Sequence, residues 1–169
     1  PTFGTGFIPP FTGNYFFVQE NANVGAGNPG GLGTAQQPFN TIQQALAKCV
    51  SGNNDVIFLT GTVHVSAAQG AIAWNKNNTH LVGLCAPLKR GKRARVSVSG
   101  STPFSHLFDV SGNGCLFQNF GTFYGFPTTG ATSPICWNDT GGRNSYNLVE
   151  FLGFGDNTVT TGTANQTTA

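Results

Sequence analysis

The feature that most constrains this chain is a long succession of short strand-like runs. From Asp55 onward, runs of four to six residues rich in Val, Ile, Phe and Leu are separated by Gly, Asn, Pro and Ser. β-Branched and aromatic residues favour strands, whereas Gly, Asn and Pro favour turns. The pattern predicts an all-β fold and argues against a coiled coil or a helical bundle. The expected strands are residues 14–19, 55–59, 62–66, 71–74, 79–84, 95–98, 106–110, 115–120, 135–137 and 147–152.

One helix is expected over residues 40–50, before most of these strands. Asn40 or Thr41 is the expected N-cap, and Gln43 or Gln44 follows three residues later as its capping-box partner. Apolar residues then recur at helical spacing and give the helix one apolar face. The predicted core contacts of this helix are Phe39, Ile42, Leu46 and Cys49.

Residues 15–58 resemble a known family. A strand, a loop rich in Gly and Asn, the run Gln37–Leu46 and then the run Asp55–Leu59 are similar to the N-terminal part of right-handed parallel β-helices of the pectate-lyase type. Residues 117–123 and 149–154 resemble the rung strands of these proteins. The resemblance covers residues 15–154. It implies a short right-handed parallel β-helix with an N-terminal capping α-helix.

The resemblance also implies a division of the chain and a range of functions. Residues 1–13 are expected to form an N-terminal arm, residues 14–154 a single β-helix domain, and residues 155–169 a tail rich in Thr, Gly and Asn. The superfamily includes polysaccharide lyases and hydrolases, phage tailspikes and many non-enzymatic phage virion proteins.

An internal similarity suggests how the rungs are aligned. Residues 116–121 match residues 148–153 in their hydrophobic and Gly positions, which aligns Leu116 with Leu148. A repeat of about 30 residues is typical of stacked coils. This alignment predicts that Glu150 lies above Gln118 and that Asp109 corresponds to Gly141, so that no two acids stack on neighbouring rungs.

Catalysis is not expected. Glycosidases need two carboxylates about 5–9.5 Å apart, and lyases need a base beside a bound cation. The chain has six carboxylates in all, and the expected alignment separates them. Its four cysteines form no Cys-x-x-Cys pair, so free thiols are expected, with no metal site and no cofactor.

The scarcity of charge points to protein partners. Only 8% of the residues are charged, against roughly 25% in ordinary domains, so much of the surface is expected to be buried against other protein. We expect a homo-oligomer, a trimer by analogy with related virion β-helices, and contacts with capsid or other virion proteins. A net charge of +2 argues against nucleic acid as a partner. The membrane is disfavoured because no apolar run approaches the length of about 20 residues that a membrane-spanning helix needs.

Five of the eight basic residues form one run, which has two interpretations. The run consists of Lys89, Arg90, Lys92, Arg93 and Arg95. It is either a solvated loop or a docking loop for an acidic neighbouring subunit or an anionic host glycan. Nucleic acid is disfavoured because no aromatic side chains interleave these charges.

Together these features predict a non-enzymatic structural protein of a phage virion. A capsid decoration or head-fibre protein is favoured, located in the virion and assembled in the host cytoplasm. Two alternatives stay open: a tail or receptor-binding protein that engages host polysaccharide, and a β-helical carbohydrate-active enzyme, either a lyase or a glycosidase.

Overall fold

The computed structural model describes residues 12–20, 31–87, 93–99, 106–123 and 135–152. This part contains one short helix and twelve strands, so the expected all-β class is confirmed. Its elements are β1 (Tyr15–Val18), α1 (Ile42–Lys48), β2 (Asp55–Leu59), β3 (Thr62–Ser66), β4 (Ile72–Trp74), β5 (Thr79–Gly83), β6 (Arg95–Ser99), β7 (His106–Val110), β8 (Leu116–Gln118), β9 (Gly121–Phe123), β10 (Ile135–Asp139), β11 (Ser145–Asn147) and β12 (Glu150–Leu152).

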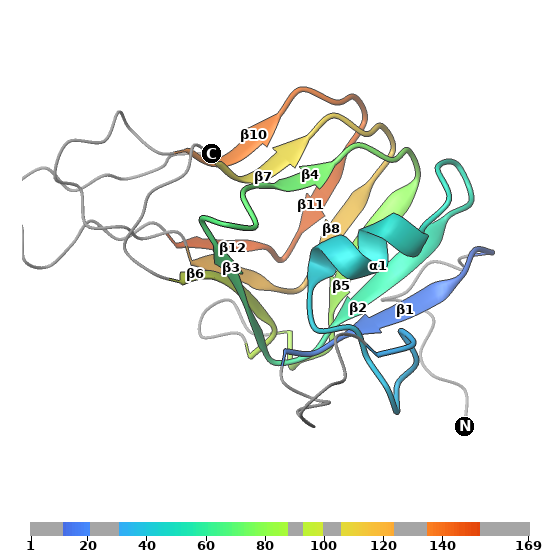
Figure 1. Ribbon diagram of the computed structural model, residues 1–169. Coiled ribbons are helices and arrows are strands. Elements are labelled where there is room, and N and C mark those ends of the chain that lie inside the picture. The colour runs from blue at the N-terminus through green and yellow to red at the C-terminus, as the bar shows by residue number, and fades with distance from the viewer. Residues whose placement is uncertain (1–11, 21–30, 88–92, 100–105, 124–134, 153–169) are drawn as a thin grey trace, which may run out of the picture.

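The strands form three parallel sheets. Sheet A has the order β1-β2-β5-β8-β11, sheet B the order β12-β9-β6-β3, and sheet C the order β10-β7-β4. After β1 and α1 the chain visits sheets A, B and C in turn, and we call each such set of strands a rung (Figure 1). The rungs are β2–β4, β5–β7, β8–β10 and the partial rung β11–β12. Each strand therefore pairs with the equivalent strand of the next rung.

The sequence-based alignment of the last two rungs was wrong. Leu116 pairs with Ser145 rather than with Leu148, and Gly121 pairs with Glu150 rather than with Gly153. The true register is set by a corner between sheets A and B that the sequence pattern did not reveal. Each of the predicted strands 115–120 and 147–152 includes this corner, which begins at Asn119 (φ 58°) in the first and at Leu148 (φ 54°) in the second.

The corrected register changes the neighbours of two acids. Glu150 lies beside Gly121 instead of Gln118, and Asp109 lies beside Asn138 instead of Gly141. Within the described ranges, each acid that lies in a paired strand still has a non-acidic residue as its cross-strand neighbour.

The connections from sheet A to sheet B differ in length between rungs. Two residues suffice in the first, third and fourth rungs, namely residues 60–61, 119–120 and 148–149. The second rung uses residues 84–94 for the same step. This longer connection contains most of the basic run.

The main core lies between the three sheets and is aromatic in its later rungs. In sheet C, Phe108 stacks on Trp137 with ring centroids 4.0 Å apart. In sheet A, Phe117 stacks on Tyr146 at 5.2 Å. A smaller cluster of Val56, Phe58 and Val82, with Phe17 beside it, occupies the opposite face of sheet A, as strand alternation requires.

Helix α1 packs against β1, β2 and β4, at the end of the stack where the chain enters it (Figure 1). Thr41 is its N-cap, and Gln44 completes the expected capping box. The helix is shorter than residues 40–50, because Cys49 already has an extended backbone. No helix in the part of the chain described here is long and apolar enough to span a membrane.

Candidate functional site

The predicted docking loop is described only at its C-terminal end. Lys89, Arg90 and Lys92 lie outside the described residues. Arg93 is exposed, and Arg95 is half-buried at the start of β6, where it pairs with Thr62 and Gly121. Arg95 is therefore the first residue of a strand, as the expected strand 95–98 predicted, and does not lie in the loop that the basic run was expected to form.

The predicted helix contacts all lie in the main core. Phe39, Ile42, Leu46 and Cys49 have 6% or less of their surface exposed. Burial, assisted by the charge of Asp55, raises the pKa of the Cys49 thiol to about 12, so this thiol stays protonated and behaves as a small apolar group. All four cysteines are free, and Cys85 alone among them is not buried.

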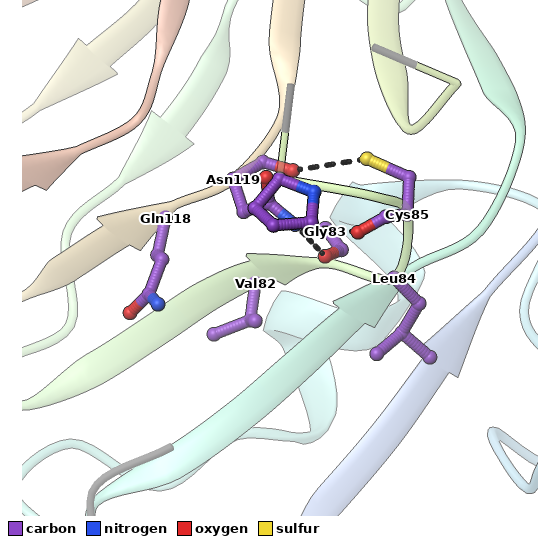
Figure 2. A pocket seen from close by; sticks show the side chains of 7 residues that line it. Val82, Gly83, Leu84, Cys85, Gln118 and Asn119 are labelled. Atoms are coloured by element: carbon purple, nitrogen blue, oxygen red, sulfur yellow. Dashed lines mark hydrogen bonds between the residues drawn. The ribbon is translucent and has the colours of Figure 1, made fainter. Parts of the chain in front are cut away.

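A pocket of about 390 Å³ opens where the long connection leaves β5 (Figure 2). It was not predicted from the sequence, because its walls come from two rungs. Its lining residues are Val82, Gly83, Leu84, Cys85, Pro87, Gln118 and Asn119.

Asn119 fixes the rim of this pocket. Its side-chain Nδ2 donates hydrogen bonds to the carbonyl oxygens of Gly83 (3.1 Å) and Cys85 (2.8 Å). The Cys85 thiol in turn donates to the Asn119 carbonyl oxygen at 3.4 Å (Figure 2). These bonds between the second and third rungs hold the start of the long connection in place. Leu84, 44% exposed, remains at the surface as an apolar wall.

A second candidate surface is the aromatic layer of the last strands. It consists of Trp137, Tyr146 and Phe151, whose rings contact one another at centroid distances of 5.4–6.2 Å. Trp137 Nε1 donates to the Tyr146 hydroxyl, which donates to Asp139. Burial and this bond to Asp139 raise the pKa of Tyr146 well above its ordinary value. The polar atoms of the layer are thus engaged internally, while Tyr146 stays 37% exposed.

The carboxylates with described contacts lie apart from one another, and each is hydrogen-bonded to its own partners. Asp55 accepts hydrogen bonds from Val50 and Asn14 backbone N–H groups and from the Asn53 side chain. Burial raises the pKa of Asp55, but these hydrogen bonds outweigh it and hold the pKa below its ordinary value. Glu20 pairs with His64, Asp109 accepts from Asn138, and Asp139 accepts from Tyr146, Asn144 and Gly141. Across the described ranges, no three His, Cys, Asp or Glu side chains gather as metal ligands would.

His80 is buried and neutral. Its Nδ1 accepts a hydrogen bond from the Leu116 backbone N–H at 3.0 Å, and its Nε2 lies 3.4 Å from Asn54 Oδ1. Burial lowers the pKa of His80 to about 4. The ring therefore links the second and third rungs as a structural hydrogen-bonding group.

Comparison with protein-family models, with curated proteins and with solved structures gives no match to this chain.

Proposed function

We propose that this chain is a non-enzymatic structural protein that works inside a larger assembly, as a capsid decoration or head-fibre protein of a phage virion. In this proposal its rungs form a right-handed parallel β-helix, and α1 caps the end at which the chain enters. The family resemblance supports the proposal, together with the three parallel sheets and the packing of α1 against β1, β2 and β4.

The observation that carries the proposal is the aromatic layer of Trp137, Tyr146 and Phe151. One face of the Trp137 ring stacks on Phe108 and one face of the Tyr146 ring stacks on Phe117, in the rung before. The layer remains partly exposed, and among the described strands none follows it. Large apolar surface with satisfied polar atoms is the usual character of a protein contact. A second copy, within a trimer, is the proposed occupant.

The carboxylates favour a structural protein over the enzymatic alternative. Asp109 and Asp139 lie on adjacent strands but one residue out of register, which directs their side chains to opposite sheet faces. Asp55 and Glu20 are each bound to their own structural partners. A paired arrangement for glycoside hydrolysis would instead place two carboxylates toward one bond.

Sedimentation of the isolated chain tests the proposal. We expect the wild type to be an oligomer at micromolar concentration. Tyr146→Lys should shift the equilibrium toward monomer, and Asp139 compensates the charge of the introduced lysine. Tyr15→Lys, at an exposed tyrosine of β1, is the matched control and should leave the oligomer unchanged. A stable monomer of the wild type at high micromolar concentration would contradict the proposal, as would release of reducing ends or unsaturated sugars from a polysaccharide panel.

A further inference from the structure

A ladder of side-chain hydrogen bonds joins the corners that precede the strands of sheet A. Ser51 Oγ accepts a hydrogen bond from the Asn77 N–H at 2.9 Å, and Asn77 Oδ1 accepts one from the Asn113 N–H at 2.9 Å. Asn113 Oδ1 accepts the next from the Gly142 N–H at 2.7 Å. Each corner is thus fastened to the following one by a single side-chain oxygen. Gly142 belongs to residues 140–144, the corner between β10 and β11, which we call the last corner.

Asn113 is also the only asparagine of the chain that is followed by glycine. In such a pair the backbone nitrogen of the glycine can attack the side-chain carbonyl carbon of the asparagine. A succinimide ring forms and ammonia leaves, and water then opens the ring at either carbonyl carbon to give aspartate or isoaspartate. The reaction needs only water as co-reactant, and Asn113 is exposed.

The fold favours glycine at position 114, although glycine makes the pair reactive. Gly114 has φ 68°, in the left-handed region that glycine accepts most readily, and a Cβ atom there would clash with Asn78 Oδ1. Glycine also has no side chain to hinder the attack of its nitrogen. The corner before β8 therefore contains a dipeptide that is prone to deamidation.

The last corner holds both reacting groups. The Gly114 N–H, which must lose its proton for the nitrogen to attack, donates to the Gly142 carbonyl oxygen at 2.9 Å. The Asn113 side-chain amide, which must turn toward this nitrogen, accepts from the Gly142 N–H and donates from Nδ2 to Asn77 Oδ1 at 3.2 Å. Ring closure therefore requires a local opening that separates Gly142 from both residues.

We propose that Asn113 is a site of spontaneous deamidation, and that the last corner keeps it unreactive for as long as this corner is in place. The step is one-way. Aspartate at position 113 lacks the side-chain N–H that donates to Asn77, and isoaspartate adds a methylene group to the main chain before Gly114. Neither product restores the full set of hydrogen bonds, so a chain that has reacted keeps a loosened last rung.

Peptide mapping by mass spectrometry, during incubation in mildly alkaline buffer, tests the proposal. We expect Asn113 to react about tenfold or more slowly in the folded chain than in the chain unfolded in urea, because only the opened fraction reacts. Equal rates in the two states would overturn the proposal.

Two variants locate the protection. Asn144→Ala removes the hydrogen bonds by which the last corner holds the Gly112 carbonyl oxygen and the Cys115 N–H, and should speed the deamidation of Asn113 about tenfold. Ser51→Ala removes a bond of the same kind at the other end of the ladder and should react like the wild type. An unchanged rate in a folded Asn144→Ala chain, or an equal increase in Ser51→Ala, overturns the proposal.

Hydrogen exchange provides a second measurement in the unmodified chain. The Gly114 N–H exchanges when its bond to Gly142 opens, so its exchange rate and the deamidation rate of Asn113 should rise in parallel as urea is added below the unfolding transition. A deamidation rate that does not follow this exchange contradicts the proposal. In the deamidated chain the Gly114 N–H should exchange faster than in the wild type, while the amides of β2 and β5 stay protected. Full protection of Gly114 in that chain would exclude the one-way step.

Discussion

Lys76 joins two parts of the chain that lie far apart in the sequence. Its ammonium group donates to the carbonyl oxygens of Leu46 (2.6 Å) and Cys49 at the C-terminal end of α1. The Cys49 N–H also donates to the Leu46 carbonyl oxygen at 3.2 Å, so Lys76 is a second donor to that oxygen, and the helix dipole favours a cation at this end. The sequence did not reveal this role, because a single lysine among polar residues is normally solvent-exposed.

Lys76→Met is therefore expected to lower the free energy of unfolding by about 1.5–3 kcal/mol, the range for hydrogen bonds to a charged group. Denaturant unfolding measures the change. Lys48→Met, on the exposed side of α1, is the matched control and should change stability by less than about 0.5 kcal/mol. Equal effects of the two substitutions would show that Lys76 does not anchor the helix.

His80 gives the fold a defined acid sensitivity. The pKa of His80 is about 4 in the folded chain and about 6.5 in the unfolded chain, so the unfolded chain binds the additional proton between these values. The stability contributed by His80 is full above pH 6.5 and is lost as the pH falls toward 4, by on the order of 3 kcal/mol. The pKa of Asp55 is lowered in the folded chain, so the stability that Asp55 contributes is lost at a more acidic pH than the stability contributed by His80.

Urea unfolding between pH 7 and pH 4 measures this loss. His80→Asn, which cannot titrate, should be less stable at pH 7 and should show a flatter dependence between pH 6.5 and 4. A wild-type stability that does not change over this interval would be inconsistent with a buried neutral His80.

At the scale of the elements, the sequence predicted strands well and corners poorly. The runs 55–59, 62–66 and 106–110 coincide with β2, β3 and β7, because Gly, Asn or Ser residues separate them from their neighbours. The run 115–120 covers β8 and the corner after it, and the run 147–152 covers the last residue of β11, the next corner and β12. Phe120 and Val149 continue the apolar pattern through these two-residue corners, so the pattern did not show where the strands end. The signal that was available is a residue with left-handed backbone shortly before each of the strands β2, β5, β8 and β11. These residues are Asn54, Asn78, Gly114 and Arg143, all with positive φ. Three of these four are Asn or Gly, the residues that accept this conformation most readily.

Leu148 is a residue poorly suited to its corner. A leucine with φ 54° is strained by about 1 kcal/mol relative to asparagine or glycine. Leu148→Asn, which reproduces Asn119 in the rung before, should therefore raise the free energy of unfolding by about that amount and the melting temperature by about 2–4 °C. Leu84→Asn, at an exposed leucine without positive φ, is the control and should give no such gain.

The packing of α1 gives a contrast within one helix. Leu46 is buried against the first rung, whereas Lys48 is exposed. Leu46→Asp would bury an unpaired charge at a cost of several kcal/mol and should cause aggregation or loss of folding. Lys48→Asp should be tolerated. Thermal melting of the two variants tests this contrast. Similar melting temperatures would mean that the helix is not packed on the sheets.

At the scale of the whole molecule, the second rung differs from the others in its long connection from β5 to β6. The sequence identified its basic run from charge alone, but the pocket escaped prediction because Val82 and Asn119 meet only when two rungs stack. Ala94 is buried beside β6 and belongs to the core, and β6 pairs with β3 and β9 in regular register although residues 84–94 precede it.

Deletion of residues 84–93 joins Gly83 to Ala94 and produces a corner equivalent to Asn119 and Phe120. We expect this shortened chain to fold, with an unchanged circular dichroism spectrum and a melting temperature within several degrees of the wild type. Failure to fold would show that the long connection is needed for the stack of rungs.

The links made by Lys76 and Asp55 give the stack two mechanically unequal ends. Asp55, in β2, is hydrogen-bonded to Asn14 just before β1 and to Val50 just after α1. Lys76, in the turn from the first rung to the second, is hydrogen-bonded to the C-terminal end of α1. The later rungs are joined by strand pairing and by side-chain hydrogen bonds such as those of Asn119 and Asn144, each linking one rung only to the next. Tension along the stack would therefore load the pairs of the later rungs one row at a time, like a zipper, and meet its greatest resistance at the first rung. Unravelling under force has a direction, from β12 toward α1.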